Sequence, residues 1–208
     1  TLYTKIAKQQ IYAGIDVMLG GGRYYLKDGR SDGRNLIDDA EKLGYTYVSD
    51  ANGLSEVTSG NVFGVFASND MSYDFDRAER QPSLEEMTVK AIELLNKNEN
   101  GFFLLVEGSK IDYASHAHDP VGVISESIAF DKAFRAAVRF AESDGNTIVV
   151  SCADHANGGM SIGTGQSGYG STNISEYLAP LKKARLTGAG VYMHLNEDRT
   201  NIREEVAK

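Results

Sequence analysis

Two stretches of the chain decide its fold, FFLLVEGSKIDYASH at residues 102–116 and NTIVVSCADHANGG at residues 146–159. Each stretch contains a continuous apolar run of strand length, which is typical of a strand covered on both faces. The segment between them, residues 120–143, has helical spacing. Its apolar stripe consists of Ile124, Ile128, Phe134, Val138 and Ala141. A strand, a helix and a strand in this order predict a βαβ unit with parallel strands and a right-handed crossover.

The residues before this unit alternate between strand and helix patterns. We expect strands at 15–19, 45–48 and 61–66, and helices at 5–12, 35–43 and 84–96. Ser83 followed by Glu86 forms a capping-box pattern that predicts the start of the last of these helices. The sequence therefore predicts an α/β fold, in which a mostly parallel sheet is flanked by helices on both faces.

The character of the sequence changes after Gly158. Residues 158–172 are rich in glycine and serine and are expected to form a loop, whereas 174–185 predict a helix. Weaker helical patterns follow at 187–195 and 201–207. We therefore expect two regions, a partial α/β catalytic core at residues 1–157 and a mainly helical insertion at residues 158–208.

Composition excludes two classes of partner. The chain has 208 residues, 41% of them hydrophobic and 24% charged, with a formal net charge of −8. This acidity argues against nucleic acid as a partner, because binding phosphate backbones requires lysine and arginine. No apolar run approaches the ~20 residues that a membrane span needs. The first residues, Thr1 to Lys5, do not resemble a signal peptide. Cys152, the only cysteine, is expected to be a buried free thiol.

Metal-ligand residue types follow both central strands. The first strand leads into Glu107, Asp112 and His116, and the second leads into Asp154 and His155. Because ligands collect at the carboxyl ends of parallel strands, these five side chains are expected at one edge of the sheet. Each pattern alone is also compatible with an ordinary salt bridge or with chance, so the prediction of a metal site rests on their convergence.

The spacing within each pair adds a geometric condition. Asp112 and His116 are four residues apart, so on a helical turn they share one face and can bind one ion. Asp154 and His155 are adjacent, so joint ligation requires the backbone to have left strand geometry there. Carboxylate with imidazole suits zinc, and a carboxylate-only position such as Glu107 suits magnesium.

These two motifs, Val106 to His116 and Ala153 to Gly159, resemble those of the alkaline phosphatases. Three further segments are similar to that family, namely residues 16–22, 66–77 and 82–88. The resemblance covers about residues 10–160. It implies that the chain is the central part of a phosphatase that hydrolyses phosphate monoesters through a phosphoserine at alkaline pH. It also implies a possible homodimer and a periplasmic, extracellular or cell-surface location.

The resemblance further implies a role for each candidate ligand. Asp112 and His116 would bind the first zinc ion, Asp154 and His155 the second, and Glu107 the magnesium ion. Two zinc ions ~4 Å apart can clamp the attacking and leaving oxygens of an in-line displacement. The helical region after residue 157 resembles the family's variable surface insertion, a crown-like region.

Other parts of the family's site have no match in these residues. In the family the serine nucleophile directly follows an aspartate, and this chain contains no Asp-Ser dipeptide, so the nucleophile has no counterpart here. The last histidine that binds the first zinc ion in the family is also missing. The other histidines are interpreted as a solvated loop residue, His118, and a structural residue, His194. We therefore expect no significant phosphatase activity from this chain alone.

Two alternatives stay open. Cofactor-independent phosphoglycerate mutases and phosphopentomutases have similar motifs, usually with manganese, and metal identity would separate them from a phosphatase. A non-catalytic module that retains the fold is the second alternative. It is motivated by the missing nucleophile and opposed by the five retained ligand residues.

Overall fold

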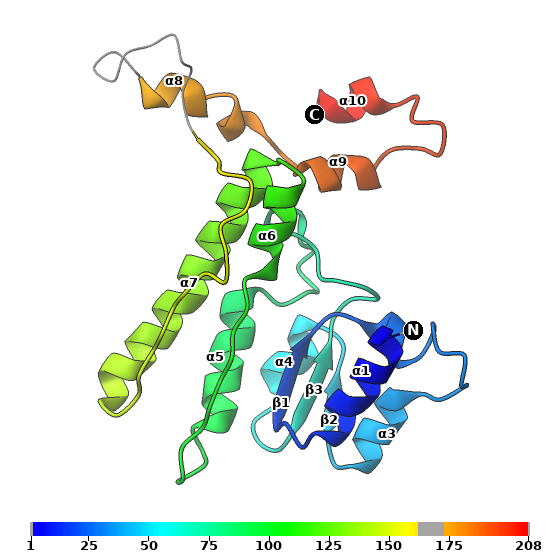
Figure 1. Cartoon of the computed structure of the whole chain (residues 1–208), viewed down its shortest axis with the longest axis vertical. Coiled ribbons are helices and arrows are strands. Elements are labelled where there is room, and N and C mark those ends of the chain that lie inside the picture. The colour runs from blue at the N-terminus through cyan, green and yellow to red at the C-terminus, as the bar shows by residue number, and fades with distance from the viewer. Residues whose placement is uncertain (1, 162–172, 208) are drawn as a thin grey trace. The chain divides into compact units, whose positions relative to one another are not determined.

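A computed structural model describes residues 2–161 and 173–207 of the chain (Figure 1). Its strands are β1 (Val17–Gly20), β2 (Thr46–Val48) and β3 (Val62–Val65). Its helices are α1 (Leu2–Tyr12), α2 (Arg23–Leu26), α3 (Leu36–Lys42), α4 (Ala51–Glu56), α5 (Leu84–Leu95), α6 (Ser109–His116), α7 (Pro120–Asp144), α8 (Ile174–Leu178), α9 (Gly188–Met193) and α10 (Ile202–Val206). Two short 3-10 helices complete them, η1 (Asp74–Asp76) and η2 (Leu181–Lys183).

The described residues divide into two compact units. Unit 1 comprises the described parts of 1–72, 77–106 and 132–149, and unit 2 comprises those of 73–76, 107–131 and 150–208. The predicted division into residues 1–157 and 158–208 cuts the chain at one point of the sequence, whereas each compact unit combines separate stretches. The predicted division therefore stays a prediction.

Unit 1 contains a parallel three-stranded sheet in the order β1-β3-β2. Val62 is paired with Val17 on one side and with Thr46 on the other. All four residues of β3 are buried, as expected for the central strand of a sheet that is covered on both faces. The parallel α/β architecture predicted from the sequence is confirmed.

Alternate residues of the central strand point into two separate hydrophobic cores. Phe63 and Val65 pack with side chains of α1, α2 and α3, including Ile11 and Leu36. Val62 packs with α4 and α5 in the second core. Successive strand residues face opposite sides of a sheet, so helices cover both faces, which confirms that prediction (Figure 1).

Gly64 sits where two side chains leave no room for a larger residue. A Cβ atom at this position would lie 2.5 Å from the Phe66 ring and 2.7 Å from a Leu19 methyl group. A larger residue at the centre of the sheet would therefore require the Phe66 and Leu19 side chains to shift.

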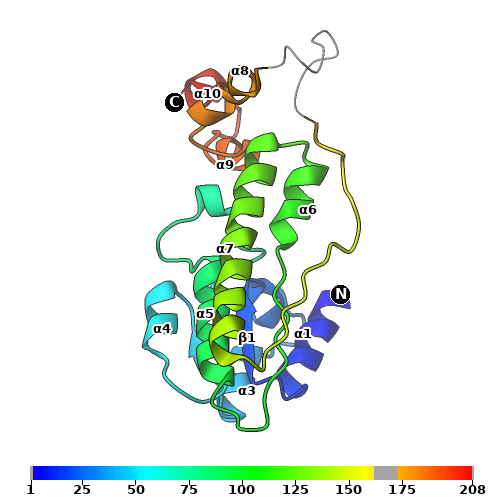
Figure 2. The same cartoon turned by 90° about the vertical axis from the view of Figure 1, so that its left-hand side faces the viewer.

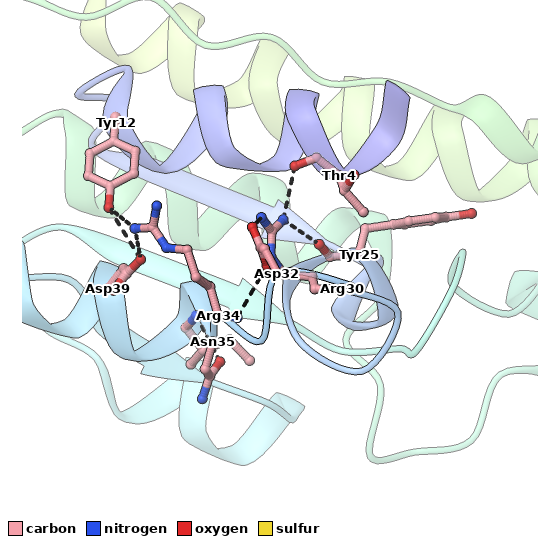
Figure 3. A network of polar contacts seen from close by, with 9 residues as sticks. Thr4, Tyr12, Tyr25, Arg30, Asp32, Arg34, Asn35 and Asp39 are labelled. Carbon is pink, nitrogen blue, oxygen red and sulfur yellow. Dashed lines mark hydrogen bonds and ion pairs between the residues drawn. The ribbon is translucent and has the colours of Figure 1, made fainter. Parts of the chain in front are cut away.

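Two arginines tie α1 to the loop before α3 (Figure 3). Arg30, whose side chain is only 4% exposed, binds both carboxylate oxygens of Asp32 and donates to the main-chain oxygens of Thr4 and Tyr25. A planar guanidinium suits such a fork of acceptors. This network holds the long irregular connection between α2 and α3 against the first helix.

A second group in the same region joins Arg34 to Asp39 and to the hydroxyl of Tyr12 (Figure 3). The hydrogen bond from Arg34 lowers the pKa of Asp39 and raises that of Arg34 itself. Asn35 caps α3 by accepting a hydrogen bond from the backbone of Ile37. The predicted start of the helix at residue 35 is thus supported by a side-chain cap.

The predicted capping box of α5 is present. The Ser83 hydroxyl accepts from the Glu86 backbone at 3.1 Å, and the Glu86 carboxylate accepts from the Ser83 backbone at 2.7 Å. This reciprocal pair satisfies two backbone donors that the first turn of a helix leaves without intrahelical partners. It lowers the pKa of Glu86, chiefly through the bond from the Ser83 backbone.

The two central strands predicted at 102–107 and 146–152 are not strands in the described chain, which corrects the predicted βαβ unit. Both segments are extended but belong to no sheet (Figures 1 and 2). Phe103 is 87% exposed and Ile148 is 88% exposed, so neither segment is covered on both faces. An apolar extended segment becomes a buried strand only when neighbouring strands pair with it, and the described residues supply none here.

Cys152 is exposed and free, which corrects the expectation of a buried thiol. The expectation was wrong because residues 146–152, which contain Cys152, do not form a buried strand. The long helix predicted between the two segments is confirmed as α7.

The described part of the region after residue 157 contains short helices joined by irregular segments. α9 and α10 confirm the two weaker helical predictions. The helix predicted at 174–185 is shorter than expected, because α8 ends at Leu178 and only the turn η2 follows. Pro180 lies between them, and proline in a helix interior removes a hydrogen bond and clashes with the preceding turn. Most of the predicted loop, residues 162–172, lies outside the described residues.

None of the helices in the described ranges is both long and apolar enough to cross a lipid bilayer.

Candidate functional site

The first pair of candidate ligands lies on α6 in unit 2. Asp112 and His116 are one helical turn apart, and Asp112 Oδ1 is 3.6 Å from His116 Nε2. The prediction that they share one helical face is therefore confirmed. α6 packs closely on the first half of α7, since a Cβ atom on Gly122 would lie 2.9 Å from that of Ala114 (Figure 2). This contact fixes the helix that carries both residues.

The second pair lies in the extended segment that follows α7. Asp154 Oδ2 is 3.3 Å from His155 Nε2, although the two residues are adjacent. In a regular strand they would point to opposite faces. Their approach meets the predicted condition that the backbone leaves strand geometry at this point. The Asp154 side chain is 88% exposed, so it is open to a ligand.

The two pairs meet at one carboxylate. His155 Nε2 lies 3.9 Å from Asp112 Oδ1, the same oxygen that faces His116. Asn157 donates a hydrogen bond to this oxygen at 2.7 Å. Sequence reasoning missed Asn157 as a site residue and treated 156–159 only as the place where the strand opens into a glycine-containing segment of the second motif. The available signal was its position, two residues after His155 in the same motif.

Glu107 is the fifth predicted ligand and is not brought into this group. It is exposed, lies before the first turn of α6, and makes no contact with the other four among the interactions described. Within residues 2–161 and 173–207, no set of three or more His, Cys, Asp or Glu side chains is arranged to hold a metal ion by itself.

The donor chemistry of the group nevertheless fits zinc. Two imidazole nitrogens and two carboxylates are ligand types that zinc takes, and the four side chains are exposed or half-buried at one place. Each pair places its oxygen and nitrogen 3.3–3.6 Å apart, which two ligands of one ion at about 2.0–2.2 Å can match. The residues thus fit two partial zinc sites that share the neighbourhood of Asp112.

Two carboxylates anchor the elements around α6 and α7. Asp119 Oδ1 caps α7 by accepting from the backbone of Val121 and Gly122, and its Oδ2 accepts from Gly188 at 2.6 Å. Asp76 accepts from the backbone and hydroxyl of Thr187, at 2.9 and 2.5 Å. α9 is therefore attached through its N-terminus to the part of the chain that carries His116.

Gly190 is required by this attachment. A Cβ atom there would lie 2.6 Å from the carboxyl atoms of Asp76. Thr187 is fully buried and also caps α9 by accepting from Gly190. We call the group of Asp76, Thr187 and Gly190 the α9 clasp.

Glu126 is a buried titratable group of this unit, as is Glu205. Glu126 is 8% exposed and accepts a hydrogen bond from the Asp74 backbone at 2.5 Å. Burial raises its pKa, with a smaller contribution in the same direction from the charge of Asp74, against opposing effects of the hydrogen bond and of Lys110. The ammonium of Lys110 lies over the rings of Tyr73 and Tyr113.

The other histidines have separate positions. His118 is exposed and follows α6 with a left-handed φ of 53°, which confirms the prediction of a solvated loop residue. His194 ends α9, where its Nδ1 is 2.8 Å from the main-chain oxygen of Gly190. This contact within the turn agrees with the structural role predicted for it.

Comparison with known proteins gives one consistent result. A family model described as "Alkaline phosphatase" matches residues 2–207. "Alkaline phosphatase 4" of Bacillus subtilis is 46% identical over 149 residues, which cover 72% of this chain and 32% of that protein. Alkaline phosphatase of Escherichia coli is 38% identical over 182 residues, covering 73% of this chain and 39% of the relative.

Solved structures agree with these sequence matches. Thermus thermophilus alkaline phosphatase superposes with a TM-score of 0.85 at 28% identity, over 93% of this chain and 41% of that chain. A cold-active alkaline phosphatase from Shewanella sp. gives 0.80 at 28% identity, over 98% and 49%. The chain spans about a third of the length of the curated relatives it matches.

Proposed function

The chain belongs to the alkaline phosphatase family, and we propose that it supplies part of a metal site for the hydrolysis of phosphate monoesters. The observation that carries this proposal is the approach of His155 to Asp112, two residues from distant parts of the sequence, at 3.9 Å. It supports the idea that the two motifs build one site and not two unrelated salt bridges.

In the proposed assignment, Asp112 and His116 hold one zinc ion, Asp154 and His155 hold a second, and Glu107 contributes to magnesium. When bound, these cations would polarise a phosphate ester and activate the attacking oxygen. The residues of this chain would hold the ions in position. They also offset the positive charge of the ions, because both pairs contain a carboxylate. The chain has no Asp-Ser dipeptide, so we propose that the serine that would attack phosphorus lies outside these 208 residues and that this chain is inactive alone.

Substrate and setting follow from the family in the same way. We propose a broad set of phosphate monoesters, a homodimer, and a periplasmic, extracellular or cell-surface location. The relatives named above are all called alkaline phosphatases, which favours this assignment over the mutase alternative.

The proposal is tested by zinc content and phosphatase turnover of the protein at its natural length. Asp112→Ala and Asp154→Ala are each expected to remove about one equivalent of zinc. Each should also lower turnover of a chromogenic phosphate ester by more than about 100-fold, the upper range for loss of an outer hydrogen-bond partner. Asp198→Ala, which removes an exposed carboxylate of the same unit, is the matched control.

Several results would contradict the proposal. Normal zinc content in both Asp112→Ala and Asp154→Ala would show that these residues are not ligands. Full zinc content without any phosphatase turnover would support the non-catalytic module, and a requirement for manganese would support the mutase reading.

A further inference from the structure

The side-chain amide of Asn157 contacts Asp112 at two points. Its Nδ2 lies 2.7 Å from Asp112 Oδ1 and 3.4 Å from the main-chain oxygen of the same residue. An ionised carboxylate can accept hydrogen bonds but cannot donate them, so the NH₂ end of the amide must face it. Asn157 is half-buried, whereas Asp154, His155 and Ala156 before it are exposed.

The backbone after Asn157 approaches the same helix. Gly158 and Gly159 have left-handed φ values of 74° and 59°, a conformation that glycine adopts without steric penalty. A Cβ atom on Gly158 would lie 3.2 Å from the main-chain oxygen of Ser115. The loop therefore contacts α6 at two successive residues, through the Asn157 side chain and the Gly158 backbone.

These contacts bear directly on the two ligand pairs. Asp112 and His116 belong to α6, and His155 belongs to the loop that Asn157 fastens to α6. The bond to Oδ1 fixes the plane of the Asp112 carboxylate, which has about four lone-pair sites and so retains capacity for an ion. Loss of the bond would free both the rotation of this carboxylate and the position of the loop.

We propose that Asn157 is a positioning residue, which orients the Asp112 carboxylate for metal binding and holds the loop of His155 in register with α6. This inference rests on the proposed function, because it requires Asp112 to be a ligand. It adds a residue outside the five predicted ligands. Mutation of the hydrogen-bond partner of a ligating carboxylate typically lowers metal affinity or activity by about 10–100-fold.

The test compares Asn157→Asp and Asn157→Gln with the parent protein at its natural length. Asn157→Asp keeps the size of the side chain but replaces the donor with a second carboxylate that repels Asp112. Asn157→Gln keeps the amide donor on a longer side chain. Asn52→Asp makes the same charge change at an exposed position of α4 in unit 1 and is the matched control.

The readouts are zinc affinity, by competition with a chromogenic chelator, and the unfolding midpoint of the metal-free protein. We expect about 10–100-fold weaker zinc binding in Asn157→Asp, recovery of most of the affinity in Asn157→Gln, and no change in Asn52→Asp. In Asn157→Gln both the zinc affinity and the metal-free midpoint should stay close to those of the parent, whereas a purely structural role of Asn157 would lower both in this variant.

The outcomes separate this inference from the proposed function. If Asp112→Ala loses zinc and Asn157→Asp binds it as tightly as the parent, the positioning role is wrong and the metal site stands. If Asp112→Ala retains all zinc, both proposals are wrong. Equal loss of affinity in Asn157→Asp and Asn157→Gln, with lowered midpoints in both, would also overturn the positioning role.

Discussion

Different kinds of interaction stabilise the interior of each of the two units of this chain. Both hydrophobic core clusters of the described residues lie in unit 1, where helices cover each face of a parallel sheet. In unit 2 the contacts that join its elements are mainly hydrogen bonds to the carboxylates of Asp76, Asp119 and Glu126. The buried side chains of unit 2 are small or polar, such as Ala114, Ala129 and Thr187.

This contrast separates stability from chemistry along the chain. Burial of apolar surface contributes about 25 cal/mol per Å² and needs no precise geometry beyond close packing. A hydrogen bond to a charged group contributes about 1.5–3 kcal/mol, and it also fixes the direction of the groups that it joins. The candidate ligands all lie in unit 2, where hydrogen bonds fix the orientation of the groups that they join. The elements that fold around a hydrophobic core lie in unit 1.

The largest effect is expected from the core of unit 1. Leu36 is fully buried between α1, α3 and β3, so Leu36→Ala should lower the free energy of unfolding of unit 1 by about 2–5 kcal/mol through lost contacts and a cavity. Amide hydrogen exchange of β3 measures this locally. Leu43→Ala, at an exposed leucine directly after the same helix, is the control. Equal protection of β3 in both variants would contradict the assignment of this core.

A smaller effect is expected from the α9 clasp of unit 2. Thr187→Val keeps the shape of the side chain but leaves the carboxylate of Asp76 and the backbone of Gly190 without their hydroxyl partner. Loss of a buried hydrogen-bond partner costs about 1–3 kcal/mol, so α9 amides should exchange about 5- to 150-fold faster while β3 is unchanged. Thr58→Val, at an exposed threonine of unit 1, should leave both alone. Faster exchange in β3 as well would show that the two units do not differ as described.

The smallest effect concerns the pH dependence of unit 2. Because burial raises the pKa of Glu126, its contribution to stability is fully present below the unfolded value near 4.5 and is lost as pH rises through the folded pKa. Asp74, Asp76 and Lys110 are the charged groups that act on it. Glu126→Gln removes this titration and can still accept from the Asp74 backbone.

Relative to the parent, the Glu126→Gln protein should therefore become more stable as pH rises above about 4.5. Thermal unfolding at a series of pH values measures the difference. Glu142→Gln, at an exposed position of the same helix, is the control. A difference that is constant from pH 4 to 8 would contradict the raised pKa.

Local patterns predicted most of the elements correctly. The capping box at Ser83 and Glu86, the apolar spacing of α3 and α7, and the strand patterns of β1, β2 and β3 each depend on neighbours within a few residues. Such information is contained in the sequence itself. The helix predicted at 174–185 failed for a local reason too, since Pro180 interrupts it.

The other predictions that failed depended on distant partners. Residues 102–107 and 146–152 have strand composition, but an apolar run does not specify which strand lies beside it. The burial of Cys152 was inferred from the same run and was wrong for the same reason. Burial is a property of what packs on a segment, and composition reports only what the segment favours.

The sequence by itself determined the parallel α/β class, the residue types of the candidate metal site and the helical face shared by Asp112 and His116. Only the tertiary structure decided that His155 approaches Asp112, that Asn157 fastens its loop to α6, and that Glu107 stays outside the group. The physical reason is range. Helix periodicity and capping act within one or two turns, whereas contacts between α6 and the loop at 154–159 depend on left-handed glycines and on packing that no local pattern encodes.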